Sequence, residues 1–141
     1  MTFRRAFAVL VSAAPVALLS SPAPAMSTYK WKQRPLVIFA PSDGHPGLIR
    51  QRGIVAALRP AFQDRQMVVV YVVGDRVSAD LGAGPGLAAA ALRQKYGVDS
   101  AAFRVLLVGK DGGVKLSSGA PIAAGKLFST IDAMPMRREE M

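Results

Sequence analysis

The strongest structural signal in the chain is the apolar run Met67-Val68-Val69-Val70-Tyr71-Val72-Val73. The run is continuous, with no alternation between apolar and polar positions. A strand with one face in water alternates the two kinds of residue, so a continuous run is typical of a strand buried on both faces. We therefore predict a central, parallel strand that helices cover on both sides.

A second run of this kind, Leu36-Val37-Ile38-Phe39-Ala40, follows Pro35 and predicts another buried strand. Between the two runs the pattern is helical from Leu48 onward, because apolar residues recur on one stripe. These residues are Leu48, Val55, Leu58 and Phe62, with Ile54 beside them. Pro60 is expected to kink or end this helix. A strand, a crossover helix and a second strand form a right-handed parallel pair.

The chain after Val73 predicts a helix, with no strand before it. Gly74-Asp75-Arg76 closes the second strand, and the glycine-rich stretch 78–86 is expected to be a flexible connection. The Ala-rich stretch 87–96 predicts a helix, and Gly97 is suited to its C-terminal cap.

A hairpin and a last helix complete the predicted domain. Val105–Val108 and Gly113–Leu116 flank an Asp111-Gly112 turn, which is a strong hairpin signal. A helix is expected around Ala123–Ala133, and Arg137-Arg138-Glu139-Glu140 is expected to be a solvated tail. The order β-α-β-α-β-β-α predicts an α/β domain with a mixed four-stranded sheet, in which the hairpin adds antiparallel strands beside the first strand.

The N-terminus has the three parts of a secretory signal. Arg4 and Arg5 precede an apolar run over 6–19, and the small residues of 20–25 predict cleavage after Ala25. The run is shorter than the roughly 20 residues that span a bilayer, so no stable membrane insertion is expected after cleavage. Arg4-Arg5-Ala6-Phe7 also resembles the twin-arginine export signature, although general secretion is favoured. The mature protein is expected to be periplasmic or secreted.

The chain then divides into a cleaved signal peptide (1–25), an N-terminal arm (26–34), one domain (35–134) and a charged C-terminal tail (135–141). Its 141 residues carry a formal charge of +9, with one histidine and no cysteine. The absence of cysteine excludes disulfides, thiolate metal sites and cysteine nucleophiles. Export disfavours nucleic acid as the partner of the basic surface, and leaves anionic envelope components or a purely solubilising role.

Several motifs resemble an uncharacterised bacterial family of exported thioredoxin-like domains of unknown function (DUF 4174). They are Pro35–Ser42, Val73–Arg76, Leu107–Gly112 and Ile131–Arg138, and the resemblance extends from about Tyr29 to Arg138. Lys95–Val98, Val105–Val108 and Lys110–Gly113 resemble the distal half of a thioredoxin-like domain more generally. The fold variant is similar to the peroxiredoxin-like domain of sushi-repeat proteins in the animal extracellular matrix. The resemblance implies a thioredoxin-like three-layer sandwich.

The chain departs from thioredoxins and peroxiredoxins at the positions that carry their chemistry. Those proteins have a reactive cysteine in the loop after the first strand, which here is Pro41–Gly47 and has none. They have a cis-proline before the final hairpin, where this chain has Phe103 or Arg104. We therefore expect no thiol–disulfide or peroxidase chemistry, and favour a protein that is not an enzyme.

The loop after the first strand is nevertheless the best candidate site, because ligands of open α/β sheets gather beyond the carboxyl ends of the strands. The possible binding residues are Ser42, Asp43, His45, Arg76 and Arg104. A loop residue that caps the following helix, and a local Asp75–Arg76 ion pair, are the alternative interpretations. One histidine and one carboxylate are too few for a metal site, so no metal, cofactor or catalytic residue is assigned.

A basic surface is the second candidate site. Its possible members are Lys30, Lys32, Arg50, Arg52 and Arg59. Tyr29 and Trp31 could pair with an anionic polymer through this surface, but docking of the arm by Trp31 is the favoured interpretation. The glycines of 82–86 lack the Gly-Lys-Ser/Thr ending of a phosphate loop and are not interpreted as one.

Three functions remain open on these residues. We favour a non-catalytic binding or interaction module whose partner is an unknown protein or an anionic envelope component. The alternatives are a peroxiredoxin-like enzyme with non-thiol chemistry, using Asp43, His45 and Arg76, and a basic binder of anionic envelope surfaces.

Overall fold

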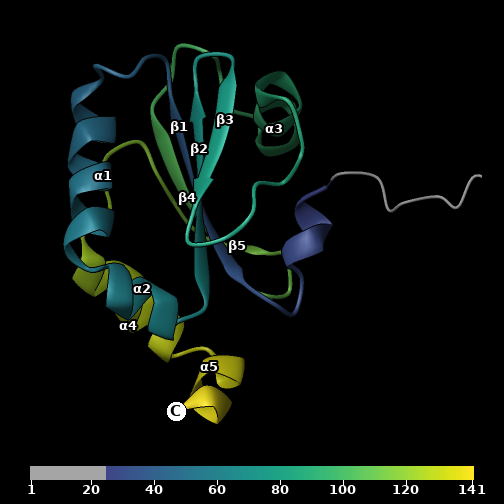
Figure 1. The fold of residues 1–141 in the computed structure, drawn as a ribbon, viewed down its shortest axis with the longest axis vertical. Coiled ribbons are helices and arrows are strands. Elements are labelled where there is room, and N and C mark those ends of the chain that lie inside the picture. The colour runs from purple at the N-terminus through teal and green to yellow at the C-terminus, as the bar shows by residue number, and fades with distance from the viewer. Residues whose placement is uncertain (1–24) are drawn as a thin grey trace, which may run out of the picture.

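A five-stranded mixed sheet forms the centre of the structure, in the order β3-β2-β1-β4-β5 (Figure 1). The computed structural model describes residues 25–141. The strands are β1 (Arg34–Ala40), β2 (Met67–Val73), β3 (Arg76–Asp80), β4 (Arg104–Val108) and β5 (Val114–Ser118). The predicted signal peptide lies outside the described residues except for Ala25.

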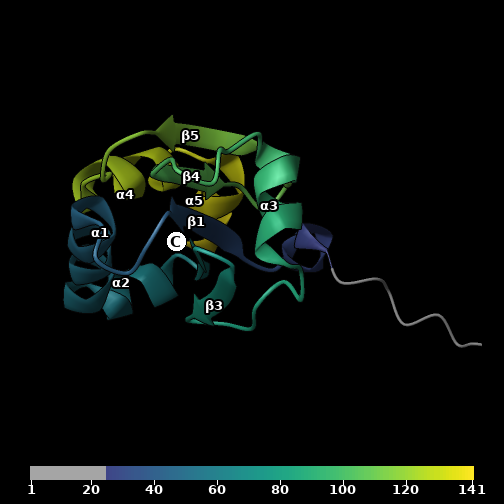
Figure 2. The same cartoon turned by 90° about the horizontal axis from the view of Figure 1, so that it is seen from above.

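Helices cover both faces of the sheet, as Figure 2 shows. They are the 3-10 helix η1 (Met26–Tyr29) and the α-helices α1 (Pro46–Ala57), α2 (Arg59–Asp64), α3 (Ala89–Tyr96), α4 (Ala124–Asp132) and α5 (Pro135–Glu140). Helices α1, α2 and α4 lie on one face, and α3 and η1 lie on the other. Within residues 25–141, no helix has the length and apolar character needed to cross a membrane.

The parallel pair β1 and β2 is buried at every position, as the two apolar runs predict. Successive residues of β1 pack on opposite faces: Leu36 and Ile38 contact the core under α1 and α4, whereas Val37 and Phe39 contact the core under α3. Strand β4 pairs antiparallel with β1, and β5 pairs antiparallel with β4. The predicted hairpin and its place beside the first strand are therefore confirmed.

The sheet has one strand more than the sequence analysis expects, so the four-stranded prediction is wrong. Residues 76–80 are strand β3, which pairs antiparallel with β2 from Val73↔Arg76 to Val69↔Asp80. The expected flexible connection thus begins after Asp80. Gly74 and Asp75 form the two-residue loop of the β2–β3 hairpin. Gly74 has a φ of 58°, and a positive φ at the first residue of such a loop favours glycine.

The expected helices are present. The first one is interrupted at Leu58, and α2 starts at Arg59 with Pro60 in its first turn, where a missing N–H costs nothing. Gly97 caps α3 in the left-handed conformation, with φ of 65°. In α4, Leu127 and Ile131 are fully buried, as their shared face predicts.

The N-terminal arm docks through a residue other than the expected Trp31, which is 61% exposed. Tyr29 is buried instead, and its hydroxyl donates a hydrogen bond to the Ala83 carbonyl at 2.6 Å. The docking interpretation of Trp31 is therefore wrong. Trp31 contributes only its backbone, because its N–H donates to the Lys110 carbonyl at 2.8 Å.

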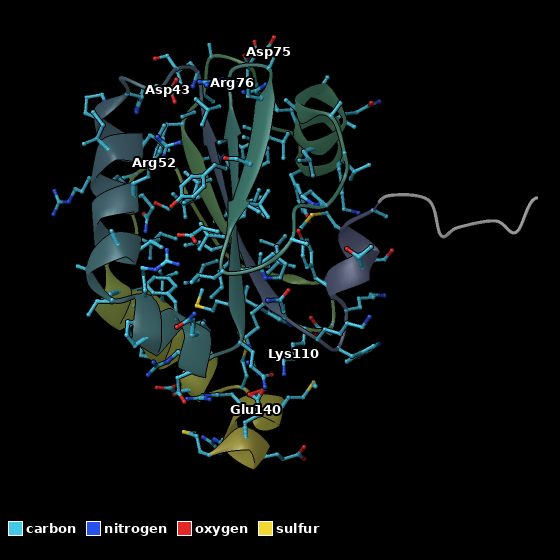
Figure 3. All side chains as sticks on the ribbon, viewed as in Figure 1. Asp43, Arg52, Asp75, Arg76, Lys110 and Glu140 are labelled. Carbon is cyan, nitrogen blue, oxygen red and sulfur yellow. The ribbon has the colours of Figure 1, made fainter. Side chains whose placement is uncertain are left out.

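The C-terminal segment is a docked helix rather than the solvated tail expected for residues 137–140. The Arg137 side chain is 6% exposed and pairs with Asp64 at 2.6 Å and Asp132 at 3.3 Å. Glu140 pairs with Arg34 at 3.0 Å and also with Lys110 (Figure 3). The expectation of a solvated tail is wrong because the partners of its charges come from distant parts of the chain.

Glu140 is the shared counter-ion of two cations that have little access to water. The side chains of Arg34 and Lys110 are 1% and 8% exposed, and that of Glu140 is 19% exposed. A buried charge without a counter-ion is costly, so the carboxylate of α5 is the group that allows both cations to stay under this end of the sheet. Burial alone would raise the pKa of the Glu140 carboxyl, but hydrogen bonds from Arg34 and Lys110 outweigh it and hold that pKa below its ordinary value.

Glu140→Gln is expected to lower the free energy of unfolding by about 2 kcal/mol, because Arg34 and Lys110 lose their counter-ion. Glu139→Gln is the matched control, since Glu139 is an exposed neighbour for which the described residues provide no ion pair. Urea denaturation of both variants measures the difference. Equal effects of the two substitutions would show that α5 does not neutralise the buried cations.

Acid is expected to destabilise the fold through the same carboxylates. A hydrogen bond from Arg65 is the largest cause that lowers the pKa of Asp132, and the pKa of Glu140 is lowered as well. A carboxyl whose pKa is lower in the folded state stabilises the protein above its unfolded pKa of about 4, and this stabilisation is lost as the pH falls through the folded value. The free energy of unfolding should therefore fall below about pH 4, and fall less steeply in the double variant Glu140→Gln, Asp132→Asn.

Candidate functional site

The loop after β1 and the β2–β3 turn lie together at the carboxyl ends of the two parallel strands (Figure 3). Asp43 in the loop pairs with Arg76 at the start of β3. Its other carboxylate oxygen lies 3.7 Å from Arg52 of α1. The predicted site residues Asp43 and Arg76 are thus neighbours, and Arg52 from the predicted basic surface joins them.

This ion cluster contains one carboxylate and two guanidinium groups, all of them on the surface. The exposed fractions of the side chains are 57% for Asp43, 43% for Arg52 and 66% for Arg76. Exposed pairs of this kind add little stability, so the cluster does not hold the fold together. The expected ion pair between Asp75 and Arg76 does not form, because Arg76 is directed to Asp43.

His45 caps helix α1, which is one of the alternatives that the loop sequence allows. Its Nδ1 accepts a hydrogen bond from the N–H of Gly47 at 3.1 Å. Its ring stacks on Phe103, with the planes 4° apart and the centroids 5.0 Å apart. Ser42 contributes its backbone carbonyl, which accepts from the N–H of His45 at 3.2 Å. The histidine is therefore held in place by a cap on one side and a ring on the other.

Arg104 lies at the same end of the sheet but has a different partner. It is opposite Phe39 of β1 and donates to the Ser117 hydroxyl of β5 at 2.8 Å. The structure thus brings Asp43, Arg76 and Arg52 into ionic contact, and leaves Arg104 with the β4–β5 hairpin.

The predicted basic surface divides into engaged and free cations. Arg59 pairs with Asp80, and the guanidinium carbon of Arg52 lies 4.8 Å from the centre of the Tyr71 ring. Burial, followed by the negative charge of Asp80, raises the pKa of Tyr71 to about 12 against the opposing effect of the two arginines. Lys30, Lys32 and Arg50 form no ion pair within residues 25–141.

Arg93 of α3 is a contributor that the sequence analysis missed. It donates hydrogen bonds to the Gly74 carbonyl and, at 3.3 Å, to the Ala40 carbonyl. Ala40 is the last residue of β1, and Gly74 directly follows β2. One guanidinium therefore connects the ends of the two parallel strands by hydrogen bonds. The Ala-rich helix around Arg93 gave no signal of this role, because both partners are far away in the sequence.

The charged and imidazole groups of this arrangement are engaged within the protein itself. The described part of the chain has no group of three or more histidine and carboxylate side chains that could hold a metal ion. Asp43 is compensated by two arginines, and the Nδ1 of His45 is occupied by the helix cap. What remains open to a partner is a charged surface with two guanidinium groups for one carboxylate.

Gly47→Ala is expected to destabilise the protein by about 1–3 kcal/mol through overpacking. A Cβ at this position would lie 2.9 Å from Cε1 and Cζ of the Phe103 ring, which His45 already covers on one side. Gly53→Ala is the matched control in the same helix. Nothing lies within 4 Å of its Cβ, so it should raise the free energy of unfolding by about 0.5–1 kcal/mol. Thermal and urea unfolding should show shifts of opposite sign, and shifts of the same sign would contradict the packing described here.

Comparisons with known proteins identify the family of the chain, and the description of that family gives no function. No solved structure matches the chain. The family described as "Domain of unknown function (DUF4174)" matches residues 25–140, which include all five strands and the C-terminal helix α5. The chain therefore belongs to this family of domains of unknown function.

Proposed function

We propose that the protein is an exported, thioredoxin-like domain that acts as a non-catalytic binding module. A mixed sheet with helices on both faces, and a parallel pair followed by an antiparallel hairpin, support the thioredoxin-like assignment. The basic, apolar and small-residue parts of residues 1–25 support export to the periplasm or the medium.

One observation carries the proposal: the two titratable side chains of the β1–α1 loop, Asp43 and His45, are engaged within the protein itself. Asp43 is bound by Arg76 and Arg52, and the Nδ1 of His45 accepts from the Gly47 N–H. A general base needs a free lone pair within reach of the proton that it removes, and a nucleophile needs activation by such a base. Because the chain also has no cysteine, the loop lacks the groups that would make it an active site.

The binding surface that we propose is the outer side of α1 next to this loop. Ile49 is 59% exposed. The next residue of the helix, Arg50, is also exposed and has no ion pair within the described residues. Arg52 follows Ile49 by three residues on the surface of α1, and Asp43 lies 3.7 Å from Arg52. An exposed apolar residue with a rim of charges is typical of a protein interface, and the excess of arginine favours an acidic partner.

Site-specific photo-cross-linking tests the proposed surface. A photoreactive residue at Gly44 is compared with one at Gly119, because a Cβ at either position meets nothing within 4 Å. With the full chain in its own cells, position 44 should capture a defined partner that position 119 does not. Ile49→Asp should reduce this capture at least fivefold. Identical captures at both positions, or capture that Ile49→Asp does not change, would contradict the proposed surface.

An activity measurement tests the non-catalytic part of the proposal. Protein prepared free of contaminating thiol enzymes should reduce peroxide and disulfide substrates no faster than buffer. Turnover above that level that is lost in His45→Ala would overturn the proposal and support the alternative, a peroxiredoxin-like enzyme whose chemistry uses non-thiol groups.

A further inference from the structure

A cavity lies on the face of the sheet opposite α1. Its volume is about 440 Å³, and it is formed by the N-terminal arm, the end of α3 and the β4–β5 turn. Figure 2 shows η1 and α3 together on that face of the sheet. Binding cavities for small molecules have volumes of about 300–1,000 Å³, so this one is large enough to hold a ligand.

The lining of the cavity combines polar groups with apolar side chains and the rings of Tyr29 and Tyr96. Met26, Pro35 and Val108 are buried and form part of the lining. The ring of Tyr96 lines the cavity from α3 and packs edge-on against Phe39 of the sheet, at 6.2 Å between centroids. The Tyr96 hydroxyl has no hydrogen bond to any residue of 25–141. Burial raises its pKa above the ordinary value, so at neutral pH it stays protonated and able to donate.

Two lysines give the cavity a positive rim. Lys30 and Lys95 both line it, and neither pairs with a carboxylate among residues 25–141. The acidic residue of the rim, Asp111, is already neutralised: one oxygen lies 2.8 Å from the Lys115 ammonium, and the other accepts from the Gly113 N–H at 2.9 Å. The charge that a ligand meets is therefore positive.

The stem of Lys30 packs on the turn beneath it. A Cβ on Gly112 would lie 3.0 Å from Cε of Lys30, so the lysine stem packs directly over this glycine. Gly112 has a φ of 84°, which also favours glycine at this position. Lys95 is held from the other side, where its ammonium lies 5.7 Å from the centre of the Tyr96 ring. The two cations thus approach the cavity from different elements.

We propose that this cavity binds a small phosphate monoester, whose phosphate lies between Lys30 and Lys95 and whose organic part packs against Tyr96 and the apolar side chains of the lining. Lysine binds phosphate as a point charge. Apolar side chains beside that charge favour a phosphate ester over inorganic phosphate, because they can contact the organic part of the ester. The inference goes beyond the proposed binding module, because the cavity shares no residue with the α1 surface.

Titration of the ¹⁵N-labelled mature protein tests the inference, with glucose 6-phosphate as the probe. Amide shifts should be concentrated in the arm, in residues 95–98 and in the 109–113 turn, with saturation at millimolar concentration. Glucuronate, glucose and inorganic phosphate are the comparison probes. The phosphate ester should bind at least fivefold more tightly than inorganic phosphate, and glucose should not bind.

Matched variants separate the cavity from general surface charge. Lys30→Gln and Lys95→Gln should each weaken glucose 6-phosphate binding at least fivefold. Lys126→Gln should leave it unchanged, because Lys126 is an exposed lysine that lines a different cavity and forms no ion pair within residues 25–141. Tyr96→Phe should weaken binding without changing the folded spectrum, since it removes only the hydroxyl.

The contradicting results are equally specific. Shifts scattered over all lysine-bearing surfaces, equal weakening by Lys126→Gln and Lys95→Gln, or tighter binding to phosphatidylglycerol vesicles than to glucose 6-phosphate would each overturn the proposed ligand site. Tighter binding of glucuronate than of the phosphate ester would overturn the assignment of the ligand class. None of these results affects cross-linking from position 44, so failure here is distinguishable from failure of the proposed function.

Discussion

The parallel pair of β1 and β2 is the constraint on which the rest of the structure depends. All fourteen of its residues are buried, so the sheet needs cover on both faces. Helices α1, α2 and α4 bury one face, and α3 with the N-terminal arm buries the other. The same pairing aligns the two strand ends, because Ala40 and Val73 are opposite each other. The loop after β1 and the β2–β3 turn are therefore brought together by the core itself.

The ion pairs at the two ends of the sheet differ in their exposure to water. At the carboxyl ends of β1 and β2, Asp43 and its arginines are exposed to water, where ion pairs are weak and can be exchanged for contacts with a partner. At the other end, Arg34 and Lys110 are buried and depend on Glu140 of α5. Loss of a buried counter-ion is costly, so the ion pairs at this end contribute more to stability than the exposed pairs at the first end.

The sequence predicted the elements with strong local signals and missed those that depend on distant partners. Continuous apolar runs identified β1, β2 and β4, Gly97 marked the end of α3, and Pro60 indicated the interruption between α1 and α2. Strand β3 was missed because its residues 76–80 are only half-buried at the sheet edge, although the Gly74-Asp75 pair is a hairpin signal. Helix α5 was missed because Glu140 and Arg34 are 106 residues apart. The cavity could not be predicted, since three separate segments form it.

The central claim is that the Asp43 end of the fold recognises a partner and performs no chemistry. Hydrogen–deuterium exchange of the chain, with and without the partner captured from position 44, tests it most directly. The account predicts that the partner slows exchange in the β1–α1 loop and in α1, over residues 41–57, and leaves α5 unchanged. Slower exchange confined to α5 or β5, with none in the loop, would contradict it.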